Sequence, residues 1–325
     1  MSQLKTPLQP AYLHPKAVVQ TWHVPPFMGG IRADQYLVYK IGRLSRTRAQ
    51  NLIISGDFRS VEGSLKASRR FFGGEAVQLW RMPPDEAPLT LKKIDILFEN
   101  DDFVVINKPT DLVIHPTSRH LYQTLTHWFL QKYPENTPHP CHRLDRETSG
   151  VLIAARNKKT QSHLKTAFMR GKIEKTYLAI VRGNMENPLH ITWPLALQGD
   201  RGLVRIRMIH DAENGLLCET HVKPLQYYPD SDRTLVECHP KTGRQHQIRA
   251  HLSLEGFPIV GDKLYAMGDE YFDAFTQDKA IKRPDHHRHA LHAHALSFEL
   301  FGKEYTFTAP LPDDLLSLLI PRNLS

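Results

Sequence analysis

The segment His142–Gly150, with the sequence HRLDRETSG, places one carboxylate between two arginines. Asp145 is flanked by Arg143 and Arg146, and nearby positive charge favours the ionised form of a carboxyl group. An ionised carboxylate that is held in position acts in enzymes as a nucleophile or as a general base. The apolar run Val151–Ala155 follows directly, so a loop salt-bridge cluster ahead of a core strand is the alternative interpretation.

Three further segments favour the catalytic interpretation. They are NDDFVVINKPTDLVIHP at 100–116, IEKTYLAIVRG at 173–183 and TLVECHPKTGRQHQIRAHLSLEGFPIVGD at 234–262. Together with HRLDRETSG, and in this order and spacing, they closely resemble the RluA family of RNA pseudouridine synthases. The resemblance covers nearly all of residues 90–310 and therefore predicts the pseudouridine synthase fold for this part of the chain.

The resemblance also implies roles for five residues. Asp145 matches the essential aspartate that initiates isomerisation of a uridine, and Arg249 matches a basic residue that pairs with it. Tyr177 matches a tyrosine that packs against the target base. Arg143 matches an arginine near the flipped nucleotide, and Ile248 matches an apolar position that lines the uracil pocket. Two departures lie nearby, with Asp111 where glycine is usual and Gln245 where threonine is usual.

The implied reaction breaks the N-glycosidic bond of a uridine, rotates the base and rejoins the ribose to carbon 5 of uracil. No atom is gained or lost, so we expect no cofactor, no nucleotide and no metal. The uridine must leave its stack, at a cost of a few kcal/mol. Structured RNA is the expected partner, with large-subunit ribosomal RNA favoured and transfer RNA second. A non-catalytic RNA-binding factor of ribosome assembly is the alternative, against which the intact Asp145, Tyr177 and Arg249 argue.

Two other groups of residues suggest competing chemistry. The run HHRHALHAH at His286–His294 contains histidines, which are common metal ligands, but no cysteine or acidic ligand set accompanies it. We therefore predict a surface or phosphate-contacting role for it and no metal site. Cys141 stands next to His142, yet no third orienting group is implied, so we expect this cysteine to pack in the interior. The chain has no glycine-rich phosphate loop, which argues against a nucleotide-dependent small-molecule enzyme.

The positive charge of the chain lies at its beginning. The 325 residues carry 42 Lys and Arg against 34 Asp and Glu, a formal net charge of +8. Residues 1–81 hold 12 of these bases and 4 of these acids, so the rest of the chain is neutral in sum. The segment 32–63 resembles the S-four-type RNA-binding domain, which pairs two short helices with a strand and turn. The candidate RNA-binding residues of this region are Arg43, Arg46, Arg48, Arg59, Lys66, Arg69 and Arg70.

Composition and hydropathy bound the remaining possibilities. A hydrophobic fraction of 41% excludes a disordered chain. No apolar stretch approaches the ~20 residues of a membrane span, and no signal peptide is visible. The three cysteines form no paired motif, which fits a reducing compartment. We therefore expect a cytoplasmic monomer that has no membrane association.

The elements that must position Asp145 indicate an α+β fold with a mixed, largely antiparallel central sheet. We predict an arm at 1–28, an S-four-type domain at 29–82, a proline-rich linker at 83–88 and a catalytic domain at 89–325. Apolar spacing predicts, among others, strands at 112–114, 151–155, 173–181 and 203–209 and helices at 31–41, 46–55, 121–132, 158–170 and 245–254.

Overall fold

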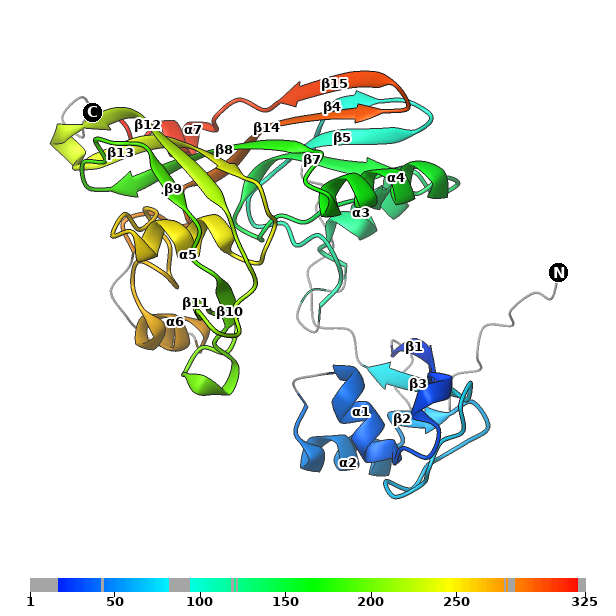
Figure 1. The fold of residues 1–325 in the computed structure, drawn as a ribbon. Coiled ribbons are helices and arrows are strands. Elements are labelled where there is room, and N and C mark those ends of the chain that lie inside the picture. The colour runs from blue at the N-terminus through cyan, green and yellow to red at the C-terminus, as the bar shows by residue number, and fades with distance from the viewer. Residues whose placement is uncertain are drawn as a thin grey trace. The chain divides into compact units, whose positions relative to one another are not determined.

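The computed structural model describes residues 17–41, 44–81, 94–117, 120, 122–277, 279 and 284–320. The chain divides into two compact units, Met1–Glu86 and Ala87–Ser325, each of which is described by itself (Figure 1). The linker that we predicted at 83–88 lies outside the described residues. No helix in the described part of the chain has the length and hydropathy of a membrane span.

The N-terminal unit packs two helices on a small antiparallel sheet. Its sheet has the order β1-β3-β2, and Tyr36, Phe58 and Phe71 are fully buried in its core. The elements are β1 (Val18–His23), η1 (Pro26–Met28), α1 (Ala33–Ile41), α2 (Arg46–Ile54), β2 (Phe58–Ser60) and β3 (Ala76–Arg81). Val18–His23, which we assigned to an arm at 1–28, instead form β1, which pairs along its whole length with β3. Residues 1–16 of the predicted arm lie outside the described residues.

The second unit is built on a sheet of ten strands, and the predicted α+β class with a mixed, largely antiparallel sheet is confirmed. Among the described strand pairs of this sheet, only β7 and β14 run parallel. The strand order is β4-β5-β7-β14-β8-β13-β12-β9, with β15 on β14 and β6 on β7. The strands are β4 (Asp95–Glu99), β5 (Phe103–Lys108), β6 (His139–Pro140), β7 (Ser149–Ala155), β8 (Glu174–Arg182), β9 (Leu189–Ile191), β12 (Thr220–Tyr228), β13 (Arg233–Pro240), β14 (Leu291–Leu300) and β15 (Lys303–Thr308).

Strand β7 is buried on both faces, which explains its unbroken apolar sequence. One face, including Leu152, packs with Trp128 and Phe129 of helix α3 (Leu125–Lys132). The other face, including Ile153, packs with Leu164 of helix α4 (Lys158–Met169). The loop that carries Asp145 therefore enters a strand that is held from both sides.

Gly150 allows the parallel pair to form. Its φ of 115° lies in the region that favours glycine, and a Cβ at this position would lie 2.1 Å from the carbonyl oxygen of Ala293. Ser149 and Gly150 pair in register with His292 and Ala293 of β14. Any side chain at Gly150 would force β14 away from the strand that follows Asp145.

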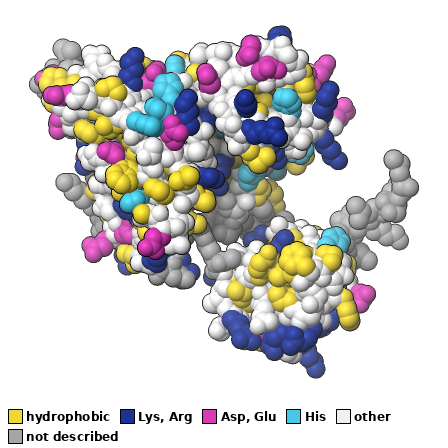
Figure 2. All heavy atoms as spheres, in the orientation of Figure 1, with side chains coloured by type: hydrophobic (Ala, Val, Ile, Leu, Met, Phe, Trp, Pro, Cys, Tyr) yellow, Lys and Arg dark blue, Asp and Glu magenta, His cyan; other side chains and the backbone are white. Residues whose placement is uncertain are grey.

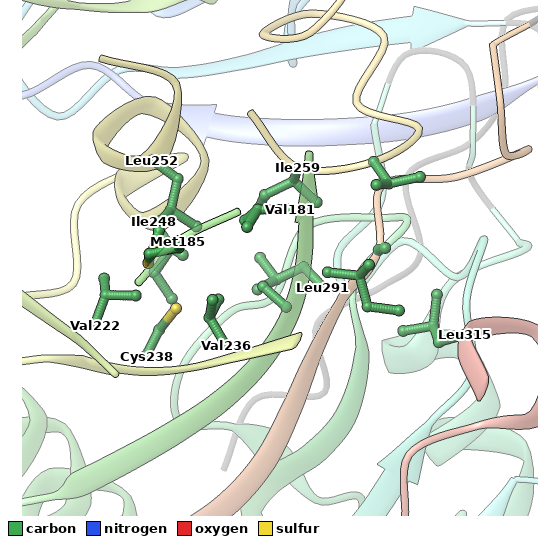
Figure 3. Close-up of a cluster of buried hydrophobic side chains, with 14 of the residues drawn as sticks. Val181, Met185, Val222, Val236, Cys238, Ile248, Leu252, Ile259, Leu291 and Leu315 are labelled. Carbon is green, nitrogen blue, oxygen red and sulfur yellow. The ribbon is translucent and has the colours of Figure 1, made fainter. Parts of the chain in front are cut away.

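Helix α5 (Gln247–Leu254) lies against the sheet and carries Arg249. Two other residues of α5, Ile248 and Leu252, stand four positions apart. They are buried with Val222, Val236 and Cys238, as Figure 3 shows. The remaining elements are β10 (Leu195–Leu197), η2 (Gly199–Arg201), β11 (Met208–His210), η3 (Pro229–Ser231), α6 (Asp269–Thr276) and α7 (Asp313–Leu316).

Two predicted strands are wrong. Residues 112–114 lie in a loop with a single bridge between Val113 and Thr124, and the carbonyl of Leu112 accepts a hydrogen bond from Lys108. Of the predicted strand at 203–209 only its end is extended, as β11, and Val204 and Arg207 close a turn before it.

Candidate active site

Asp145 lies in the loop between β6 and β7, with its side chain 20% exposed. Its Oδ2 accepts a hydrogen bond of 2.8 Å from Nη1 of Arg249. The main-chain carbonyl of Asp145 also accepts a 3.1 Å bond from the amide of Thr148, which closes the loop into a turn. Arg249 thus holds the carboxylate and the turn holds its backbone, while part of the side chain stays accessible.

Arg249 is itself held by Asp262, a residue to which the sequence analysis assigned no role. Nε and Nη2 of Arg249 donate to the two carboxylate oxygens of Asp262 at 2.6 and 2.9 Å. Asp262 is fully buried and also accepts the amides of Leu264 and Tyr265, each at 3.0 Å. A bidentate pair of this kind fixes the plane of the guanidinium. Arg249 therefore presents its remaining edge to Asp145 in one orientation.

The charges around Asp145 keep it ionised. Burial alone would raise its pKa, but the positive charges of His246, when protonated, and of Arg249 outweigh burial and hold this pKa below its usual range. Nε2 of His246 lies 3.9 Å from Oδ2 of Asp145. Burial, together with the charge of Arg249, lowers the pKa of His246 to about 4. At neutral pH, His246 is therefore uncharged, and Arg249 is the cation that acts on Asp145.

The arginines adjacent to Asp145 in sequence play a different part from the one that their spacing suggested. Arg146 turns to Glu147, with Nη2 3.4 Å from its carboxylate, and its Nε lies 3.7 Å from Asp111. Arg143 is exposed at the wall of the cavity. The ion pair to Asp145 is therefore supplied from α5 and not from the HRLDR segment.

A cavity of about 750 Å³ opens beside Asp145. This volume lies in the range of pockets that bind small molecules. All five residues that the resemblance singled out line the cavity, together with Leu291 and Phe168: they are Arg143, Asp145, Tyr177, Ile248 and Arg249. Fold and helix packing therefore gather a carboxylate, aromatic rings, apolar side chains and cations in one place.

Tyr177 comes from β8, near the middle of the sheet, where it pairs with Cys238 of β13 and Ala293 of β14. Burial raises the pKa of its hydroxyl, and the charge of Asp145 raises it further. The tyrosine is therefore protonated at neutral pH and presents a neutral ring to the cavity.

The cavity also has a basic lining. Lys165, Lys175, Lys241 and Arg244 contribute to it in addition to Arg143. Nζ of Lys175 donates to the carbonyl of Thr242 at 2.9 Å, and burial with the nearby charge of Lys241 lowers the pKa of Lys175 to about 8. These cations match the phosphates that flank a nucleotide.

Lys108 anchors the loop that carries Asp145 through a hydrogen bond to its backbone. This fully buried lysine donates to the carbonyls of Pro109, Leu112 and Arg146 at 2.9, 3.0 and 3.1 Å. It thereby joins residues 108–112 to the HRLDR segment, which contains Asp145. Sequence alone predicted no role for Lys108, because nothing local indicates which carbonyls a lysine will meet.

The histidine-rich segment is only in part the surface patch that we predicted, because His287 is exposed but two other histidines are buried. His289 and His292 are 2% and 1% exposed. Nε2 of His289 lies 2.8 Å from Oγ1 of Thr148, and Nδ1 of His292 lies 2.9 Å from Oγ of Ser149. These histidines reach the turn that follows Asp145 because β14 pairs with β7, a contact that the sequence pattern did not reveal.

The predicted RNA-binding residues of the N-terminal unit differ in their exposure and contacts. The exposed ones are Arg46, Arg48, Lys66 and Arg70. Arg46 donates to the buried Asp34 at 3.1 Å, and Arg70 to the carbonyl of Gly30 at 2.6 Å. Arg69 pairs with Glu75, Arg59 is partly buried in β2, and Arg43 lies outside the described residues. Figure 2 shows Lys and Arg side chains together on the side of this unit where Figure 1 places α2.

Comparisons with known proteins give one consistent result. Residues 102–254 match the RNA pseudouridylate synthase family. The chain is 32% identical over 305 residues to ribosomal large subunit pseudouridine synthase D of Nitrosomonas europaea, with 91% of this chain and 86% of that protein covered. It is 35% identical to an uncharacterised RNA pseudouridine synthase of Helicobacter pylori, with 87% and 92% covered. The solved structure of human RNA pseudouridylate synthase domain containing 1 aligns with a TM-score of 0.58 at 26% identity, over 73% of this chain and 92% of that one.

Proposed function

Because the chain belongs to the RNA pseudouridylate synthases, as an enzyme of the RluA type, we propose that it converts uridine in large-subunit ribosomal RNA to pseudouridine with Asp145 as the catalytic carboxylate. The observation that carries this proposal is the ion pair between Asp145 and Arg249 at the wall of the cavity that Tyr177 lines. It supplies an ionised, positioned carboxylate next to an aromatic surface for the base.

The side chains that line the cavity have different roles in the proposed reaction. A uridine flips into the cavity and stacks on Tyr177, and stacking of this kind contributes ~1–3 kcal/mol per base. Asp145 then attacks the sugar or the ring, or assists formation of a glycal, and the N-glycosidic bond breaks. The freed uracil rotates and carbon 5 joins the ribose, any bond to Asp145 breaks, and carbon 5 loses its proton while N1 gains one. Ile248 and Leu291 present apolar surface to the base, while Arg249 keeps Asp145 ionised and oriented.

The preference for ribosomal RNA rests on two supports. Relatives that match most of this chain are named for modification of the large ribosomal subunit. The basic lining of the cavity and the exposed Arg48 and Lys66 suit a large, structured polyanion. We propose that the N-terminal unit is an S-four-type RNA-binding domain that adds affinity, and that the catalytic unit performs the chemistry.

Pseudouridine mapping tests the proposal. Ribosomal and transfer RNA from a strain that lacks the gene are compared after complementation with the wild-type chain, Asp145→Asn or Asp101→Asn. The last variant removes an exposed carboxylate outside the cavity and serves as the matched control. We expect loss of a large-subunit pseudouridine, restored by the wild type and Asp101→Asn only. Restoration by Asp145→Asn would refute the role of Asp145, and a site lost only from transfer RNA would refute the proposed substrate.

A further inference from the structure

The outer face of the large sheet carries three histidines in one row, far in sequence from the cavity residues of HRLDR. His221 of β12 lies directly opposite His190 of β9 and His239 of β13. The next pair in the ladder, Val222 and Cys238, is buried in the core, so by the alternation of strands the histidine row faces solvent. Figure 2 shows histidine side chains gathered on this part of the sheet beside an acidic side chain.

Two of these histidines share one carboxylate. Oε1 of Glu219 lies 2.8 Å from Nε2 of His221 and 3.3 Å from Nε2 of His190. The two imidazole rings are stacked, with centroids 4.3 Å apart and planes inclined by 8°. The three ligand atoms all lie within 4.8 Å of one another. Ligands at ~2.1 Å around a tetrahedral zinc ion are about 3.4 Å apart, so small side-chain adjustments suffice to enclose an ion.

We propose that His190, Glu219 and His221 bind one divalent transition-metal ion of the zinc class, with water as the fourth ligand. Imidazole nitrogen and carboxylate oxygen are ligands that zinc prefers. The side chains are 57%, 42% and 42% exposed, so an ion enters directly from solvent. The free cysteines Cys141, Cys218 and Cys238 are all buried and do not compete for it.

A second group of potential ligands, His286, His287 and Asp314, is less suited to a cation. Both carboxylate oxygens of Asp314 already accept hydrogen bonds from the buried Arg288, at 2.6 and 3.0 Å. An ion there would lie against a fixed guanidinium and be repelled by it. Glu219 has only the two imidazoles as ion-pair partners among the described residues.

The metal would connect an edge strand to the cavity wall. β9 is only three residues long and is held by pairing with β12. The backbone of Glu219 donates to Oγ1 of Thr242 at 3.0 Å and accepts from the amide of Lys241 at 2.9 Å, and both of those residues line the cavity. Bound metal therefore stabilises β9 and the 240–243 segment together, so the melting temperature should rise with metal concentration.

Metal titration tests the site. The full-length chain without an affinity tag is stripped with a chelator and titrated with Zn²⁺ at pH 7.5 against a chromophoric zinc indicator. We expect one saturable equivalent, with affinity reduced at least about 10-fold in His190→Ala and in His221→Ala. Glu219→Gln should weaken binding as well, because it removes the charge but keeps the shape. Co²⁺ in place of Zn²⁺ should give a visible absorption band that is lost in the same variants.

The matched control is His239→Ala. His239 stands in the same row but has its own partner, Glu237, with Nε2 2.9 Å from the carboxylate, and it lies outside the ligand set. This variant should bind metal like the wild type. The proposal is overturned if no equivalent saturates, if His190→Ala and His221→Ala bind normally, or if only the double variant His286→Ala/His287→Ala loses binding. None of these readouts involves pseudouridine formation, so the outcome is independent of the proposed function.

Discussion

Nη1 of Arg249 lies 2.8 Å from Oδ2 of Asp145, although the two residues are 104 positions apart in the chain. Arg249 reaches this position because its other nitrogens are engaged by the fully buried Asp262. The pair joins a loop ahead of β7 to a helix packed on β12 and β13. Both the stability of the unit and its proposed chemistry therefore depend on one guanidinium.

Arg249→Ala should destabilise the catalytic unit as well as abolish pseudouridine formation. The substitution leaves Asp262 buried without its charge partner, and breaking such a pair costs about 3–5 kcal/mol. Denaturant unfolding measures the loss. In Arg143→Ala, which removes an exposed arginine from the same cavity, the free energy of unfolding should change by less than about 0.5 kcal/mol while RNA affinity falls. Equal unfolding curves for both variants would contradict the structural role of Arg249.

Tyr177→Phe should retain RNA affinity within about two-fold, because the ring that stacks on the flipped base is preserved. Tyr177→Leu keeps apolar volume but removes the aromatic face, and it should weaken binding by about 1–3 kcal/mol, which is roughly 5- to 150-fold. Filter binding with a substrate RNA fragment measures both. Equal affinities for the Phe and Leu variants would rule out stacking on Tyr177.

The stability of the catalytic unit should fall as the pH decreases from about 6.5. Burial lowers the pKa of His289 to about 3 and that of His292 to about 4. The unfolded chain takes up these protons near pH 6.5 and the folded chain does not, so each histidine removes about 1.4 kcal/mol of stability per pH unit until its folded pKa is reached. Buried carboxylates such as Asp262, whose folded pKa is lowered, act only below about pH 4.

Unfolding free energies at pH 7, 6 and 5 check this pH dependence. In His289→Gln the dependence of the unfolding free energy on pH should weaken by about 1.4 kcal/mol per pH unit, because glutamine does not titrate. The exposed His139→Gln provides the control and should keep the wild-type slope. A wild-type stability that is constant between pH 7 and 5 would show that these histidines are not held neutral by burial.

Arg48→Ala should weaken RNA binding uniformly across sequences and reduce the salt slope of affinity by about 1, because an exposed phosphate contact is lost. Arg46→Ala should instead lower the melting temperature of the N-terminal unit, since Arg46 binds the buried Asp34. Affinity measured over a series of salt concentrations separates the two effects. If the salt dependence of RNA affinity is unchanged in both Arg48→Ala and Lys66→Ala, the N-terminal unit does not bind RNA through these two residues.

The local sequence pattern was sufficient to predict features that depend on residues close together in the chain. The run Val151–Ala155 is apolar without interruption, and it is a strand covered on both faces. The helix that we predicted at 46–55 is α2, which begins at Arg46, and the side chain of Ser45 accepts the amide of Arg48 as its N-cap. The segment HRLDRETSG marked Asp145 by residue type and spacing, and the resemblance extended the set to Tyr177 and Arg249.

Only the tertiary structure decided which charges meet. Arg146 stands next to Asp145 in sequence but has its ion pairs with Glu147 and Asp111. Arg249 and His246 come from another segment and reach Asp145 through the packing of α5 on the sheet, and Asp262 holds Arg249 in place. In the same way, pairing of β14 with β7 buries His289 and His292. Sequence determined the chemical groups, whereas contacts between residues distant in the chain determined their partners, their ionisation and the cavity that they line.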